Sequence, residues 1–217
     1  MVQNYPRPVA PRRASGVTDS RRHSGQNDGM DIKEILLNHL RSSREALLWK
    51  TEGLSERELR LPRTVTGTNL LGLIKHCAFV EHGYFIDCFA RTSPIVIPAL
   101  DYDADPNADF YATRDERAVD LIRQYREVGQ VVDRAIEEMP LETPGHVAWW
   151  GEKGETTLAR VLVHVLNDVT RHAGQADIIR EGIDGAAGLL SGNTNLWEPT
   201  EGWAAHRTML TRLADEA

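Results

Sequence analysis

Four stretches of the chain repeat apolar residues at the three- and four-residue spacing of an amphipathic helix. They span about residues 31–53, 68–90, 113–139 and 156–181. The second stretch is apolar around most of its circumference, which is typical of a helix at the centre of a bundle. No segment shows a convincing alternation of apolar and polar residues, as a half-buried strand would. The pattern therefore predicts an all-α protein built on a four-helix bundle.

Capping and helix-ending residues predict where the helices begin and end. Asp31 with Glu34, and Thr113 with Glu116, place an acid three residues after a capping residue and predict helix starts. Ser55 with Glu58 predicts a short extra turn, and Gly182 predicts the end of the fourth helix.

Three regions follow from composition and pattern. Residues 1–29 are rich in Pro, Ser, Gly and Arg without a helical period, which predicts a disordered extension. Residues 30–185 form the bundle, and residues 186–217 form a tail packing on it, with a short helical segment near 203–214.

Bulk properties exclude several classes of protein. With 41% hydrophobic residues, the 217-residue chain can bury a core without disulfides. On one helix Cys77 and Cys88 would lie ~16 Å apart, beyond disulfide reach, so we expect buried thiols in a reducing cytoplasm. A net charge of −7 argues against a nucleic-acid partner. No segment is long and apolar enough for a membrane span, and the N-terminus lacks the apolar region of a secretory signal.

The fourth helix contains the residues most suggestive of chemistry. His164, Asp168 and His172 follow one another at four-residue intervals and form one stripe along the helix. His172 falls inside the apolar face, Asp168 at its edge and His164 toward solvent. A carboxylate and an imidazole one turn apart, facing a core, need a partner there, since an unpaired buried charge is costly.

A divalent cation is one such partner, because ligands at i and i+4 are the geometry of helical metal motifs. His76, a polar residue among apolar ones in the second helix, supplies a third ligand. The alternative is structural: Asp168 pairs with Arg160 or Arg171, and His172 is a core histidine bonded to a carbonyl. Spacing alone leaves both open.

Two strings resemble a known superfamily. The segment Leu70–Phe85, around His76, and residues 161–185, around Asp168 and His172, are similar to the corresponding helices of DinB-like proteins. They resemble most an uncharacterised, mini-circle-type branch common in actinobacteria, and more distantly mycothiol-dependent maleylpyruvate isomerase. The resemblance implies a DinB-like four-helix bundle over roughly residues 31–185, with His76, Asp168 and His172 as metal ligands.

Asp168 departs from this pattern, since the superfamily has His there and this branch Glu. The shorter side chain makes metal occupancy an open question. Zinc is the first expectation for two histidines and a carboxylate, with nickel, iron and manganese as alternatives. His164, Arg171 and Gln175 are candidate additional or orienting residues, or else ordinary surface residues. Trp149 and Trp150 either wall a substrate pocket or cap the core.

The function expected from the resemblance is a metal-dependent thiol S-transferase or isomerase, transferase- or hydrolase-like, acting on a mycothiol-type small-molecule thiol and an electrophilic substrate. No catalytic residue is assigned beyond the ligands. Two alternatives stay open: a non-catalytic metal-binding or stress-response bundle, and a metal-free interaction bundle, which would form a homodimer through an apolar helix face. Localisation in the cytoplasm is expected in each case.

Overall fold

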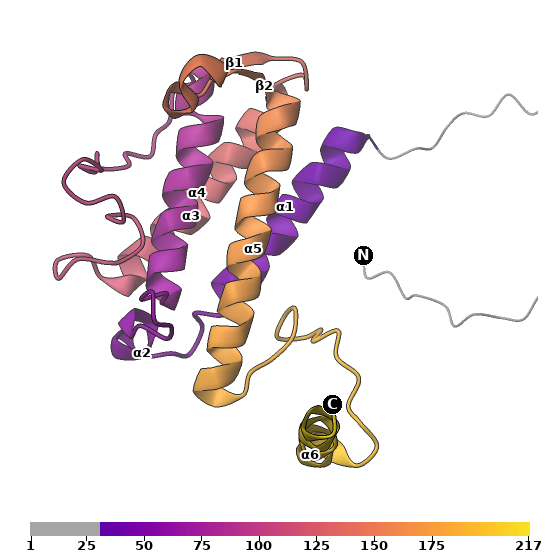
Figure 1. Ribbon diagram of the computed structural model, residues 1–217. Helices are drawn as coiled ribbons and strands as arrows, with labels where there is room; N and C mark the ends of the chain where they lie inside the picture. Colours follow the sequence, from indigo (N-terminus) through magenta and orange to yellow (C-terminus); the bar gives the residue numbers. More distant parts are fainter. Residues whose placement is uncertain (1–30) are drawn as a thin grey trace, which may run out of the picture. The chain divides into compact units, whose positions relative to one another are not determined.

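Four long helices make up most of the chain that the structure, a computed structural model, describes (Figure 1). The described residues are 31–217, so the extension predicted for residues 1–29 lies outside them. The long helices are α1 (Ile32–Trp49), α3 (Leu70–Phe85), α4 (Ala118–Glu138) and α5 (Leu158–Asp184). The predicted all-α, DinB-like bundle is confirmed.

The four helices pack as a closed ring around one core. Helix α1 contacts α5 and α4, and α3 contacts the same two helices from the other side. Helix α3 is buried around most of its surface, as its apolar composition predicted. It lies beside α5, and the two helices meet along a seam between the magenta and orange ribbons of Figure 1.

Several predicted helix ends differ from the structure. The first helix ends at Trp49 rather than at Gly53, and the second at Phe85 rather than at Ala90. The third helix begins at Ala118 rather than at Thr113, because the carboxylate of Glu56, from another element, accepts from the backbone N–H of Ala118. The fourth ends at Asp184 with Gly185 as its cap, at φ 79°, whereas Gly182 continues the helix. Of these two glycines, Gly185 alone has the left-handed conformation of a glycine cap.

A small sheet was missed by the sequence pattern. Strands β1 (Pro144–His146) and β2 (Glu155–Thr157) pair antiparallel, and η2 (Ala148–Lys153) connects them. Three residues are too few for alternation to stand out from chance. The hairpin sits at the end of the α3–α5 seam where α5 begins (Figure 1).

The remaining elements are short or peripheral. Helix α2 (Glu56–Arg60) starts with the predicted capping box of Ser55 and Glu58, and η1 (Asp87–Phe89) follows α3. Helix α6 (Gly202–Asp215) has no buried residue, and the packing of residues 186–217 on the bundle stays a prediction. Among the described helices, none has the length and apolar character needed to span a membrane.

Candidate metal centre

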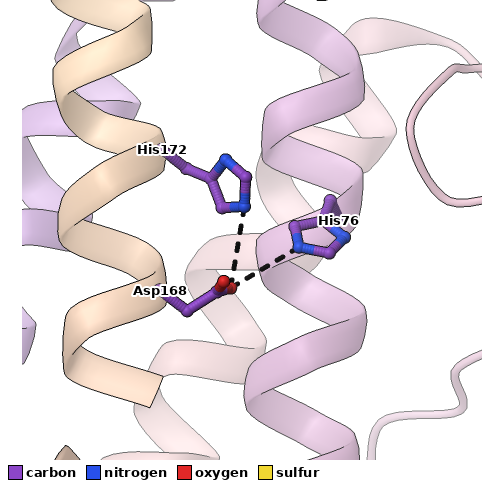
Figure 2. A group of neighbouring side chains, drawn as sticks. All are labelled: His76, Asp168 and His172. Carbon is purple, nitrogen blue, oxygen red and sulfur yellow. Dashed lines mark ion pairs between the residues drawn. The ribbon is translucent and has the colours of Figure 1, made fainter. Parts of the chain in front are cut away.

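The α3–α5 seam brings three predicted residues together (Figure 2). His76 extends from α3, and Asp168 and His172 extend from successive turns of α5. One oxygen of Asp168, Oδ2, lies 3.5 Å from His76 Nε2 and 3.7 Å from His172 Nε2. One potential ligand atom from each residue lies within 4.8 Å of the others.

Asp109 orients the imidazole of His76. Its Oδ2 lies 2.7 Å from His76 Nδ1, and the aspartate is only 6% exposed. A carboxylate accepts only, so Nδ1 is the protonated nitrogen and Nε2 faces Asp168. Such a carboxylate behind a histidine ligand fixes its ring and raises its basicity. The sequence analysis did not identify Asp109.

The loop that supplies Asp109 is fastened to α3. A Cβ on Gly72 would lie 1.9 Å from the carbonyl oxygen of Phe110, so only glycine permits this approach. Asn69 and Lys75 donate to the carbonyls of Phe110 and Tyr111, at 3.2 and 3.1 Å. The Phe110 ring in turn stacks on His76 at 4.0 Å between centroids. These contacts hold Asp109 at a fixed position behind His76.

Gln175 orients His172 in a similar way. Its Oε1 accepts a 2.8 Å hydrogen bond from His172 Nδ1, which leaves Nε2 facing Asp168. Gln175, a candidate orienting residue from the sequence, is thus hydrogen-bonded to His172.

The facing atoms are all electron-pair donors. With both Nδ1 atoms protonated, the neutral imidazoles present lone pairs on Nε2 toward a carboxylate oxygen. Asp168 Oδ2 is buried and has no hydrogen-bond partner among residues 31–217. Buried polar atoms normally find a partner, and a cation or a proton is the kind of partner that a carboxylate oxygen accepts.

Burial and mutual interaction shift the pKa values of His76, Asp168 and His172. Burial lowers the pKa of His76, but the hydrogen bond with Asp109 and the proximity of Asp168 outweigh it and the net shift is upward. Burial raises the pKa of Asp168, while the neighbouring His76 and His172 lower it more. Burial lowers the pKa of His172, and the charge of His76 adds to this. His76 is therefore the more basic of the two imidazoles that face the Asp168 carboxylate.

The spacings from the carboxylate to each imidazole fit a divalent cation. Two ligands on a tetrahedral ion with bonds of ~2.0–2.2 Å lie ~3.3–3.6 Å apart. The distances from the carboxylate to the two imidazoles, 3.5 and 3.7 Å, are close to this value. The shorter aspartate side chain therefore reaches the position that a ligand would occupy.

The other predicted residues lie elsewhere. His164 is exposed and its Nε2 lies 3.1 Å from the hydroxyl of Tyr84, outside the cluster. Arg171 is exposed on α5. Arg160, considered as a partner for Asp168, lies instead over the ring of Trp150, 4.6 Å from its centroid. The ion pairs that Asp168 makes with described residues are with the two histidines.

Comparison with known proteins places this bundle in a family. No curated protein matches the chain. The family model described as Mycothiol-S-transferase matches residues 35–185, which include all of α3, α4 and α5 and most of α1. That family is part of the DinB-like superfamily, in agreement with the resemblance of the two helical strings. The chain belongs to the mycothiol S-transferase family.

Proposed function

We propose that this protein is a metal-dependent S-transferase that joins a mycothiol-type thiol to an electrophilic substrate. His76, Asp168 and His172 would hold the divalent cation. The observation that supports this most strongly is the convergence of two imidazole nitrogens and one buried carboxylate oxygen that has no hydrogen-bond partner among the described residues. The family match supports the thiol as the substrate class.

The donor set suits catalysis better than a structural role. Two histidines and one carboxylate leave coordination positions open for a substrate, unlike closed four-ligand structural sites. Zinc is the first candidate, and nickel, iron and manganese accept the same ligands. A divalent cation held there would lower the pKa of a thiol that approaches it, which makes thiolate available near neutral pH.

The surrounding residues prepare the site for this chemistry. Asp109 and Gln175 keep both Nδ1 protons away from the seam, so that neither imidazole needs to rotate when the cation enters. Phe110 covers one face of His76 and shields it from water. Such preorganisation is what a histidine ligand needs for high metal affinity.

Metal analysis tests this proposal directly. Protein purified without chelators and incubated with Zn²⁺ should contain about one equivalent per chain, as for a single site of this type. At a free zinc concentration of about 100 times Kd, binding should stabilise the fold by about 2.7 kcal/mol, measured as a rise in the free energy of unfolding. Asp168→Asn should abolish both effects, whereas Asp103→Asn, an exposed loop control, should keep them.

A cobalt-substituted sample separates catalysis from mere metal binding. Adding mycothiol should produce a sulfur-to-cobalt charge-transfer band, which requires an accessible coordination position. Zinc well below one equivalent would refute the metal centre and favour the metal-free interaction bundle. Bound cobalt with no new band would refute the transferase proposal and favour a non-catalytic metal-binding protein.

A further inference from the structure

A second polar cluster lies farther along the α3–α5 seam. The hydroxyl of Tyr84, in α3, is contacted by three nitrogen atoms: Trp149 Nε1 at 3.0 Å, Trp150 Nε1 at 3.1 Å and His164 Nε2 at 3.1 Å. Tyr84 is 8% exposed. The proposed metal chemistry does not use this cluster.

Counting donors and acceptors fixes the protonation pattern. An indole N–H can only donate, and a phenol oxygen accepts two hydrogen bonds and donates one. The two tryptophans therefore occupy both acceptor positions of the Tyr84 oxygen. Its proton must be donated to His164, whose Nε2 accepts it. The neutral imidazole of His164 then carries its own proton on Nδ1.

The Nδ1–H of His164 is available to a ligand. His164 is an exposed residue, and this nitrogen makes no hydrogen bond within the part of the chain that the structure describes. The hydrogen bond to Tyr84 keeps the ring from rotating and presenting its bare nitrogen instead. The ring of Trp150 lies edge-on to His164 with 5.1 Å between ring centroids, and Trp149, which packs on Tyr84, is 58% exposed.

The cluster is close to the proposed metal centre. His164 precedes Asp168 by one turn of α5, about 6 Å along the axis. Tyr84 follows His76 by eight residues of α3, about 12 Å along its axis. Because α3 and α5 are in contact, both clusters border the same seam.

We propose that His164 is a catalytic proton donor to the electrophile, and that Tyr84, held by Trp149 and Trp150, is the positioning residue that fixes its donor nitrogen. This inference rests on the S-transferase function proposed above. It selects electrophiles that acquire negative charge on oxygen when sulfur adds to them, such as epoxides and conjugated carbonyl compounds.

For an epoxide the step balances as follows. The thiolate sulfur forms a bond to carbon while the carbon–oxygen bond breaks, and the oxygen takes the proton from His164 Nδ1. The proton of Tyr84 moves to His164 Nε2, and the two indole N–H groups stabilise the phenolate that remains, as donors do in an oxyanion hole. The proton that the thiol released to solvent later binds His164 Nδ1, and His164 Nε2 returns its proton to the Tyr84 oxygen, which restores both groups. No electron donor or acceptor is needed.

Two electrophiles test this role in the zinc-loaded protein. With mycothiol as the thiol, styrene oxide needs a proton on its leaving oxygen, whereas monobromobimane releases bromide and needs none. For His164→Gln we expect kcat/KM with styrene oxide to fall about 100-fold, the ordinary contribution of a general acid. With monobromobimane it should stay within about twofold. His146→Gln, an exposed histidine bonded to Glu155, is the matched control and should change neither rate.

Tyr84→Phe supplies a readout independent of turnover. Nitrogen-15 NMR of the His164 ring should show the Nδ1–H tautomer in the wild type and a mixture of tautomers in the variant. Zinc content and circular dichroism of both variants should match the wild type, which separates this role from folding and from the metal centre.

The outcomes separate the two proposals. Equal losses with both electrophiles, no loss with either, or an Nε2–H tautomer in the wild type would overturn the proton-donor role and leave the S-transferase proposal intact. If the zinc-loaded wild type turned over neither electrophile, both proposals would be wrong.

Discussion

Two polar clusters, both anchored on α3, are built on opposite principles. One joins Arg44 of α1, Glu81 of α3, and Tyr125 and Asp133 of α4. Arg44 contacts Glu81 at 2.6 Å and Asp133 at 3.1 Å, and the Tyr125 hydroxyl donates to Glu81 at 2.8 Å. The other joins His76, Asp168 and His172, where three electron-pair donors face one another. The first has donors matched to acceptors, and the second does not.

The difference indicates what each cluster is for. A buried network with its partners present rigidifies a core and defines how its helices pack. In the first cluster burial lowers the pKa of Arg44, but the charge of Glu81 outweighs it and raises the pKa, so the guanidinium remains charged. In the cluster of His76, Asp168 and His172, the carboxylate oxygen without a hydrogen bond gains a partner only when a cation or proton enters. We therefore expect the first cluster to control stability and the second to control binding.

Glu81→Gln should have the largest effect on stability. It leaves the Arg44 guanidinium buried without its main counter-charge, because both side chains are at most 7% exposed. Breaking a buried ion pair in this way typically lowers the free energy of unfolding by about 3–5 kcal/mol, which urea denaturation would measure. The folded fraction should still bind zinc.

The control for this variant lies on the surface. Glu137→Gln removes one of the two carboxylate partners of Arg41, which also contacts Asp133. The Glu137 side chain is 53% exposed, so the change should cost less than about 1 kcal/mol. A similar loss for both variants would show that burial does not distinguish these pairs. Loss of zinc binding by folded Glu81→Gln would show that the two clusters are not independent.

Asp109→Asn should have the opposite profile. The variant keeps the shape of the side chain but removes the negative charge behind His76. Replacing such a carboxylate typically lowers metal affinity about 10–100-fold, which competition with a chromophoric zinc chelator would measure. The urea midpoint of the metal-free protein should change little. Asp103→Asn, in the same loop but exposed, is the matched control, and equal affinities for the two variants would contradict the orienting role.

The sequence predicted the contents of the seam because helical spacing is regular. Asp168 and His172 share a face of α5 whatever the rest of the chain does, and His76 was conspicuous as a polar residue in an apolar helix. The structure brings these three side chains together. Gln175, three residues after His172, was identifiable on the same grounds.

Residues placed by loops and by distant elements could not be found in this way. Asp109 reaches His76 from a long irregular segment in which no spacing rule applies. A glycine in the first turn of α3 was the available signal, since Gly72 permits the loop to touch the helix. The capping pair at Thr113 misled for a related reason. The carboxylate of Glu116 does accept from the Thr113 N–H, at 2.7 Å, but it also binds Lys75. Helix α4 begins only at Ala118.

The ion pair of Lys75 and Glu116 is only partly buried. Breaking it should therefore have the smallest effect on the free energy of unfolding. Lys75 Nζ is 3.0 Å from Glu116, but the glutamate side chain is 28% exposed while the lysine is 1% exposed. Burial raises the pKa of Glu116, and its hydrogen bonds with Thr113 and Lys75 lower it more, so the net pKa falls below 4.5. A carboxylate with a depressed pKa stabilises the fold above its unfolded value and loses this contribution as pH falls through the folded value. Glu116→Gln should therefore lower the free energy of unfolding by about 1 kcal/mol at neutral pH, and the difference from the wild type should close as pH falls below about 4.5.

Urea denaturation of both proteins across this pH range would measure the difference in free energy of unfolding. Glu45→Gln, exposed on α1, is the control for loss of a surface charge. A gap that persisted in acid would mean that Glu116 acts through packing rather than through its charge.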